Sequence, residues 1–234
     1  MKKFILVSKN KENGNRLRKT LIKYGFEEVK RDPDFVLSHG GDGTLLIAER
    51  KYPGIPKLAV RNSKLCYLCE NAPFELMLKS LRTGNYRYLE IPKLNANVNA
   101  KKKKHSILAF NDIIIRNKKI NQALRFSVYI NNKLKYNELI GDGVVVATPF
   151  GSTGYFYSIA RKKFKDGIGI AFSNIHNKRL NFIIAKKNDK IKIIINRGPG
   201  EIAGDNENRT IRLEEGDSIS ISNTVKDAKL IRIR

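Results

Sequence analysis

The feature that most constrains the fold is a change of pattern along the chain. In the first part, short apolar runs such as Phe4–Val7 and Phe35–His39 alternate with amphipathic segments of helical spacing. Strands that alternate with helices are typical of a parallel α/β sheet. From about Ile91 one strand-like run follows another, and helical spacing nearly disappears. The sequence therefore predicts an α/β domain over 1–88 and a β-rich domain over 89–234, whose last strand could return to the first domain.

Local signals place the individual elements. Gly25 and Gly84 predict helix ends, and Asn131-Asn132 predicts a two-residue hairpin because asparagine tolerates positive φ. Gly204-Asp205-Asn206 is interpreted as a hairpin turn only. The first domain is expected to contain, besides the two strands above, a strand at 58–60 and helices from about 17 to 24, 44 to 50 and 73 to 81. The second is expected to contain strands at 107–110, 113–116, 124–130, 133–136, 144–147, 182–185, 191–195 and 219–221.

The charge balance is strongly basic. The 234 residues include 46 Lys plus Arg against 22 Asp plus Glu, a formal net charge of +24. Such a surface would attract nucleic acid, but it would equally attract a dinucleotide or a nucleoside triphosphate. The excess is spread along the chain, with one tight run at Lys101–Lys104, and aromatic residues are not interleaved with Lys and Arg as a base-stacking platform requires. A nucleic-acid partner is therefore the less favoured interpretation.

Composition also bears on location and redox state. No run of about 18 apolar residues occurs, and the basic start is followed by too few apolar residues for a signal peptide, so a soluble, cytoplasmic protein with no membrane partner is expected. The two cysteines form Cys66-Tyr67-Leu68-Cys69. This pair could be a redox pair or half of a metal site. Because no second Cys pair or His cluster completes a metal site, buried reduced thiols are the favoured interpretation.

A Gly-rich turn carrying one carboxylate follows the second predicted strand. Gly40, Gly41 and Gly43 would let backbone N–H groups approach phosphate oxygens, and the helix that follows from Thr44 adds its positive end. A carboxylate at such a place would repel phosphate, so Asp42 needs a reason to be there, such as holding Mg²⁺ or accepting a proton from an attacking hydroxyl. Taken alone, the stretch is also compatible with an ordinary turn.

A second stretch of this kind runs from Asp142-Gly143 to Tyr155. Its Gly151-Ser152-Thr153-Gly154 loop combines hydroxyls with flexible backbone, and Tyr155 and Ser158 follow at a spacing that can share one helix face. The loop suits an anion or a ribose. The alternative is a capped turn that opens a helix, with Tyr155 packed in the core.

These two stretches, with Asn111-Asp112 between them in an apolar setting, resemble the three signature segments of the NAD kinases, in order and at similar separations. The chain would be a short, lysine-rich, archaeal-like form. The resemblance implies a Rossmann-like α/β domain, a C-terminal antiparallel β-sandwich-like domain and an active site between them. It also implies phosphoryl transfer from ATP or inorganic polyphosphate to the adenosine ribose 2′-hydroxyl of NAD, giving NADP. Mg²⁺ or another divalent cation would arrive with the donor phosphates, with Asp42 as an available ligand. Relatives of this family pair through the β domain, which implies a homo-oligomer, a dimer or tetramer.

The resemblance also implies roles for individual residues. Asp42 matches the catalytic carboxylate, and Asn111 and Asp112 match the pair that contacts the nucleoside. Asp142 matches the carboxylate that holds the other end of the substrate. The phosphate turn would be Gly40, Gly41, Gly43 and Thr44, and the NAD-binding residues would further include Tyr67, Thr148, Ser152, Thr153, Tyr155 and Ser158.

The sequence departs from the family pattern at several positions, among them Ile140, where some relatives have an arginine. Asn62, Leu65 and Tyr67 match an Asn-x-Gly-x-Leu-Gly-Phe segment, but its glycines are missing, and Lys64 could supply a phosphate contact there or simply be solvated. The region after Tyr155 is shortened, and His176 is expected at the surface or in a turn. Two rival functions remain open. One is a lipid or sugar kinase that shares only the first turn, and the other is a basic nucleic-acid-binding protein on a degenerate kinase fold.

Overall fold

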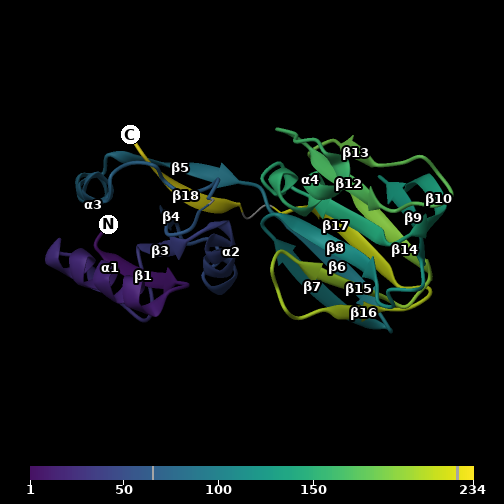
Figure 1. Ribbon diagram of the computed structural model, residues 1–234, viewed down its shortest axis with the longest axis horizontal. Helices are drawn as coiled ribbons and strands as arrows, with labels where there is room; N and C mark the ends of the chain where they lie inside the picture. Colours follow the sequence, from purple (N-terminus) through teal and green to yellow (C-terminus); the bar gives the residue numbers. More distant parts are fainter. Residues whose placement is uncertain (65, 225–226) are drawn as a thin grey trace. The chain divides into compact units, whose positions relative to one another are not determined.

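The computed structural model describes residues 1–64, 66–224 and 227–234, so the match at Leu65 lies outside the described residues. The chain divides into two structural units (Figure 1). The first consists of Met1–Ile91 and the C-terminal segment 227–234, and the second runs from Pro92 to 224. Each unit is described by itself.

The first unit is an α/β domain built on one six-stranded sheet. Its strands lie in the order β2-β1-β3-β4-β18-β5. The strands β2, β1, β3, β4 and β18 pair in parallel, and β5 pairs antiparallel to β18. The elements are β1 (Lys3–Ser8), α1 (Lys11–Lys23), β2 (Glu27–Glu28), β3 (Phe35–Gly40), α2 (Asp42–Lys51), β4 (Lys57–Arg61), α3 (Phe74–Thr83), β5 (Tyr86–Ile91) and β18 (Ala228–Ile233).

Capping residues fix the ends of these helices. The Asn10 side chain accepts a hydrogen bond from the backbone N–H of Asn13 (2.9 Å) and so caps α1. Helix α3 ends at Gly84, whose φ of 78° is left-handed, as predicted from the glycine. The core on one face of the sheet joins Phe35 and Leu37 of β3 to apolar residues of α1 and α3. The predicted helices and strands of this part are therefore confirmed, but α1 begins at Lys11, about six residues before its predicted start, because the Asn10 cap starts the helix within the polar stretch.

The second unit consists of two six-stranded sheets. Their orders are β10-β9-β14-β17-β6-β7 and β13-β12-β11-β8-β15-β16, and all the pairings are antiparallel. The strands are β6 (Leu94–Ala100), β7 (Lys103–Ala109), β8 (Asp112–Asn117), β9 (Leu124–Ile130), β10 (Lys133–Gly141), β11 (Gly143–Ala147), β12 (Ile168–Ser173), β13 (Phe182–Ala185), β14 (Ile191–Arg197), β15 (Gly200–Gly204), β16 (Ile211–Leu213) and β17 (Ser218–Asn223).

One apolar core lies between these two sheets. It combines Phe126 and Val128 of β9 with Ile113 and Ile115 of β8, together with alternate residues of most other strands. Two sheets that bury their facing sides in this way form a β-sandwich. The opposite side of β11 and β12 packs against α4 (Tyr155–Ala160), through Phe156 and Ala160. The predicted fold class, an α/β domain followed by an antiparallel β-sandwich-like domain, is confirmed.

The Asn131-Asn132 hairpin is also confirmed. Strands β9 and β10 are adjacent and antiparallel, and the two asparagines have φ of 51° and 63°. These values suit the two-residue turn that matches the twist of its flanking strands.

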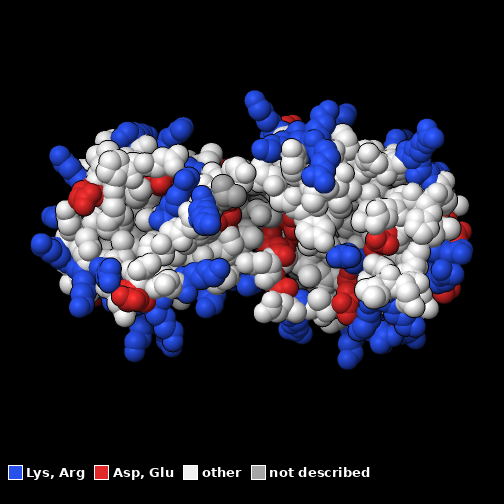
Figure 2. All heavy atoms as spheres, viewed as in Figure 1, with Lys and Arg blue, Asp and Glu red and all other residues white. Residues whose placement is uncertain are grey.

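Positive charge is widely distributed on the surface. Figure 2 shows Lys and Arg side chains scattered over the visible face of both units. Among the described residues, no helix is long and apolar enough to cross a membrane.

Candidate functional site

The first Gly-rich turn joins β3 to α2 in the first unit. Gly41 is the N-cap of α2, and Asp42 is its first residue. The Thr44 side chain packs so closely on Gly40 that a Cβ there would lie 2.1 Å from the Thr44 Oγ1. Glycine is therefore required at position 40 for steric reasons. The turn places the Asp42 carboxylate at the positive end of the helix.

The Asp42 carboxylate is fixed by the segment that follows β4. The backbone N–H of Tyr67 donates to Oδ2 (3.0 Å), and that of Leu68 donates to Oδ1 (3.0 Å). The carboxylate is half-buried, and the Tyr67 side chain beside it is 63% exposed. Two bonds leave further lone pairs on the carboxylate available to a ligand. Asp42 is thus held in orientation and can still accept a proton or bind a cation.

The cysteines next to this carboxylate form a disulfide. Cys66 and Cys69 are buried, as predicted, but the prediction of reduced thiols is wrong. Their Cα atoms are 5.5 Å apart, a separation at which two cysteine side chains can bond. The Sγ of Cys66 lies 3.3 Å from Oδ1 of Asp42. In the same segment Lys64 is exposed.

The second half of the predicted site belongs to the sandwich. The backbone N–H of Thr148 donates to the Asn111 carbonyl (2.8 Å), which ties the segment before the Gly151–Thr153 helical turn to the residue before β8. A Cβ at Gly151 would lie 2.0 Å from the Asn111 carbonyl oxygen, so only glycine fits. The Thr148 hydroxyl donates to the Phe110 carbonyl (2.9 Å) and accepts from the Gly151 N–H (3.1 Å).

The side-chain hydroxyls of this loop mainly form hydrogen bonds within the loop itself. The Ser152 Oγ donates to the Pro149 carbonyl (2.6 Å), and the Thr153 Oγ1 donates to the Phe150 carbonyl (3.1 Å). Ser152 is buried and Thr153 is half-buried. Thr148 and Ser152 therefore shape the loop, and their direct contact with NAD stays a prediction.

Sequence reasoning missed one residue of this half of the site, Asp205, which holds the backbone of Asn111 and Asp112. Its carboxylate accepts hydrogen bonds from the backbone N–H groups of Phe110 (2.9 Å) and Asn111 (2.7 Å), and the N–H of Asp112 lies at 3.3 Å. The segment does join the antiparallel strands β15 and β16, as the hairpin interpretation predicts, but Asp205 has this further role, so the restriction to a turn is wrong. A carboxylate beside a glycine after a strand is a weak signal, because it is also an ordinary turn pattern.

Asp112 is a buried carboxyl group with a perturbed pKa. It is 5% exposed. Burial, reinforced by the negative charge of Asp205, raises the pKa of Asp112 to about 7. A hydrogen bond from the backbone N–H of Tyr155 opposes this rise. The neutral acid and the carboxylate are therefore both populated near neutral pH.

Asn111 carries a buried acceptor, its side-chain Oδ1. Among the described residues, its Oδ1 has no hydrogen-bond partner. A buried polar atom without a partner costs free energy, so such atoms are rare and each needs an explanation. A ligand that donates a hydrogen bond here would remove the cost.

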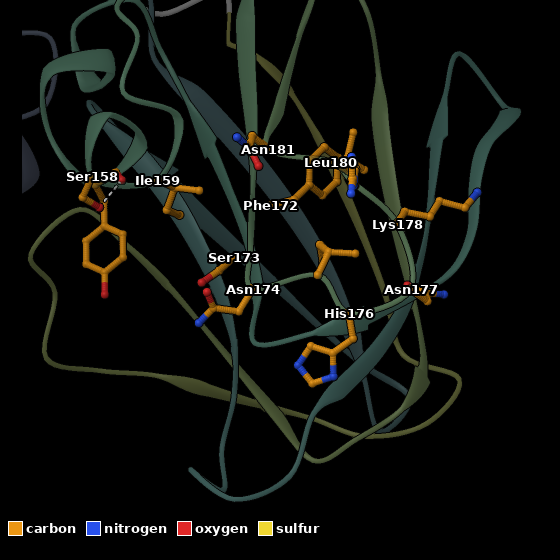
Figure 3. Close-up of a pocket in the computed structure, with 13 residues that line it drawn as sticks. Ser158, Ile159, Phe172, Ser173, Asn174, His176, Asn177, Lys178, Leu180 and Asn181 are labelled. Atoms are coloured by element: carbon orange, nitrogen blue, oxygen red, sulfur yellow. Dashed lines mark hydrogen bonds between the residues drawn. The ribbon is translucent and has the colours of Figure 1, made fainter.

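Tyr155 and Ser158 line a hollow in the sandwich unit. The hollow has a volume of about 960 Å³ and lies between α4 and the segment 172–181 (Figure 3). Tyr155 is 43% exposed, so it is not packed in the core, and its hydroxyl accepts from Arg116 (3.1 Å). On the other side Asn174 donates to the Asp142 carboxylate (2.6 Å) and links that predicted residue to the hollow. His176 is exposed on the rim, as predicted.

These residues define a class of protein. A Gly-rich turn that presents a fixed carboxylate at the start of a helix can bind phosphate and accept a proton, which is what a phosphotransferase requires. The domain model described as the ATP-NAD kinase C-terminal domain matches residues 110–233, more than half of the chain. The chain belongs to the NAD kinase family.

Individual relatives agree with this assignment. The chain is 32% identical over 232 residues to an NAD kinase of Sulfurisphaera tokodaii, a match covering 89% of this chain and 84% of the relative. It is 26% identical over 215 residues to an NAD kinase of Clostridium beijerinckii, covering 88% of this chain and 75% of the relative.

Two solved structures share the fold. One is an NAD kinase from Archaeoglobus fulgidus in complex with ATP, with a TM-score of 0.81, 19% identity, and coverage of 98% of this chain and 93% of that chain. The other is a yeast NADH kinase complexed with NADH, with a TM-score of 0.88, 17% identity, and coverage of 100% and 83%.

Proposed function

We propose that this protein transfers the terminal phosphoryl group of ATP, or of inorganic polyphosphate, to the 2′-hydroxyl of the adenosine ribose of NAD, giving NADP. Family membership supports the reaction class. The observation that carries the choice of acceptor is the buried Oδ1 of Asn111, which has no hydrogen-bond partner in the described part of the chain, beside the buried carboxyl of Asp112. Such a pair suits the amino group and hydroxyls of a nucleoside. A lipid or sugar kinase that uses only the first Gly-rich turn would leave this pair without a role.

In the first unit, Asp42 would act on the ribose hydroxyl. A ribose hydroxyl is a weak acid, so an ordinary carboxylate removes little of its proton in the ground state. In a loose, metaphosphate-like transition state the proton leaves late, and the carboxylate then mainly orients the hydroxyl in line and receives the proton. The hydrogen bonds from Tyr67 and Leu68 keep the carboxylate in one orientation for this task.

The donor phosphates would lie at the turn formed by Gly40, Gly41, Gly43 and Thr44. The first turn of α2 begins there and offers the positive end of its dipole. No group of three or more His, Cys, Asp or Glu that could hold a metal ion lies in the part of the chain that the structure describes. Mg²⁺, or another divalent cation, would be held mainly by the donor phosphates, with Asp42 as an available carboxylate. When bound, the cation would neutralise phosphate charge.

In the second unit, Asn111 and Asp112 would hold the nucleoside, with Asp205 fixing their backbone. The hollow lined by Tyr155 and Ser158, with Asp142 behind Asn174, would receive the remaining part of the dinucleotide. We also propose a homo-oligomer, a dimer or tetramer, which sedimentation analysis would measure. A monomer at all concentrations would contradict that part.

The assay for the function measures NADP formation. Purified protein is incubated with NAD, Mg²⁺ and either ATP or polyphosphate, and NADP is detected with an NADP-specific dehydrogenase. Turnover with at least one donor is expected. Folded protein that makes no NADP with either donor, but phosphorylates a lipid or sugar alcohol, would support the rival kinase. Tight, salt-sensitive DNA binding without turnover would support the nucleic-acid rival.

Asp42→Asn tests the catalytic role. The amide is nearly isosteric but cannot receive the proton, so kcat is expected to fall by about 10²- to 10⁴-fold while NAD affinity stays within about twofold. Asp32→Asn is the matched control, because Asp32 is exposed and has a φ of 49°, which asparagine tolerates. An unchanged kcat in Asp42→Asn would mean that another group is the catalytic carboxylate.

A further inference from the structure

The segment that fixes Asp42 is closed into a small ring by the disulfide. Cys66 and Cys69 bracket Tyr67 and Leu68, whose backbone N–H groups bind the two oxygens of Asp42. Arg61 also holds the ring, because it donates to the Cys66 carbonyl (3.0 Å). Loss of the S–S bond would therefore act directly on the two donors that orient Asp42.

Both sulfur atoms also face the phosphate turn. The Cys66 Sγ is 3.3 Å from Asp42 Oδ1, and the Cys69 Sγ is 3.8 Å from the Gly40 carbonyl oxygen. A disulfide sulfur carries no hydrogen, so neither sulfur donates a hydrogen bond in this structure. A thiol does carry one. In the reduced protein the Cys66 thiol would be placed to donate to the same oxygen that Leu68 now binds.

We propose that Cys66 and Cys69 form a reversible redox modification site that sets the activity of Asp42, with the disulfide as the more active form. The inference rests on the proposed function. Two cysteines separated by two residues, as here, have the spacing that is typical of cysteine pairs active in thiol–disulfide exchange. The disulfide holds the Tyr67 and Leu68 amides on the carboxylate. Reduction frees the ring and adds a thiol donor to Oδ1, which makes the carboxylate a poorer acceptor for the ribose proton.

The chemistry is thiol–disulfide exchange with a dithiol reductant. A thiolate of the reductant attacks one sulfur of the pair and forms a mixed disulfide, and the other cysteine leaves as a thiolate that takes up a proton. The second thiol of the reductant then attacks the mixed disulfide and releases the second cysteine. In sum, two electrons and two protons pass to Cys66 and Cys69, and the dithiol becomes a disulfide.

The test compares oxidised and dithiothreitol-reduced protein, with the thiol count read by alkylation and mass spectrometry. The kcat for NADP formation is expected to fall about tenfold on reduction, and the KM for NAD is expected to change less than twofold. The reason is that reduction changes the orientation of the Asp42 carboxylate and not the residues proposed to bind NAD. Re-oxidation should restore kcat. Equal kcat in fully oxidised and fully reduced protein, or a higher kcat in the reduced form, would overturn the proposal.

Two variants separate the contributions of the ring and the thiol. Cys69→Ser keeps the Cys66 thiol without the ring and should behave like reduced protein under both conditions. The double variant Cys66→Ala with Cys69→Ala lacks both, so it should show a kcat between the two forms of the natural protein and no response to dithiothreitol. A dithiothreitol response that persists in the double variant would place the effect elsewhere and overturn the proposal.

A second readout does not depend on turnover. Amide hydrogen exchange of the peptide containing Tyr67 and Leu68 should become at least about tenfold faster on reduction, because the hydrogen bonds to Asp42 loosen. Exchange that is equal in both forms would overturn the proposal. If neither form makes NADP, the proposed function fails, while this exchange measurement still decides whether the disulfide controls the Asp42 contacts.

Discussion

Replacing Asp112 by asparagine is expected to remove a pH-dependent loss of stability from the sandwich unit. The Asp112 carboxyl is buried, and its pKa rises from 3.8 to about 7. An acid whose pKa is raised by folding binds its proton more tightly in the native state than in the unfolded state. Protonation of Asp112 therefore adds to the free energy of unfolding at low pH, and this contribution is lost as the pH rises toward the pKa that Asp112 has in the folded protein.

The size of the effect follows from the shift. A shift of roughly three units corresponds to about 4 kcal/mol over the whole titration. At pH 5 the native carboxyl is protonated and the unfolded one is mostly ionised, whereas at pH 8 both are mostly ionised. The free energy of unfolding of the natural protein should thus fall by about 3 kcal/mol more between pH 5 and pH 8 than that of Asp112→Asn.

The measurement is a urea series at pH 5 and pH 8, followed by pulse hydrogen exchange of peptides from β8 and β11. These strands pair with each other and report on the sandwich alone. Asp166→Asn is the control for loss of one negative charge, because Asp166 is exposed in the same unit. If the natural protein and Asp112→Asn lose stability in parallel, to within about 1 kcal/mol, the assignment of a raised pKa to Asp112 is refuted.

Further substitutions test the packing around each half of the site. Gly151→Ala should raise the KM for NAD about tenfold or more, because the new Cβ would lie 2.0 Å from the Asn111 carbonyl oxygen and would displace the loop. An unchanged KM, measured from initial rates, would contradict this. Glu49→Ala should destabilise the first unit by about 3–5 kcal/mol in urea unfolding, because it removes the carboxylate that binds the buried Lys57 ammonium. Adding Lys57→Met to Glu49→Ala should restore much of that loss, and no restoration would argue against an ion-pair origin. Asp205→Ala should raise the KM for NAD, since the backbone N–H groups of Phe110 and Asn111 lose their acceptor, and an unchanged KM would exclude a positioning role for Asp205.

The sequence predicted secondary structure correctly where the apolar residues have a clear periodicity or a turn residue marks an end. Strands β9 and β13 have the bounds that the sequence predicts, and the Gly84 helix end and the Asn131-Asn132 hairpin follow from residue chemistry alone. Strand β6 was missed, because every second residue is asparagine, which has a low strand propensity. The structure buries the alternate apolar residues of β6 against the other sheet, so tertiary packing overrides propensity there.

The sequence by itself determined the two-part fold and the two Gly-rich turns with Asp42, and its resemblance to the NAD kinases added Asn111 and Asp112 as candidates. Periodicity and turn chemistry involve neighbours within a few residues, so they can be read along the chain. Only the tertiary structure decided which groups surround those candidates. The Asp42 carboxylate meets the Tyr67 amide 25 residues away, and Asp205 meets the Asn111 amide 94 residues away. Contacts of this range depend on how strands are ordered in the sheets. The same long-range packing raises the pKa of Asp112, places β18 next to β4, and brings the Cys66–Cys69 disulfide against Asp42.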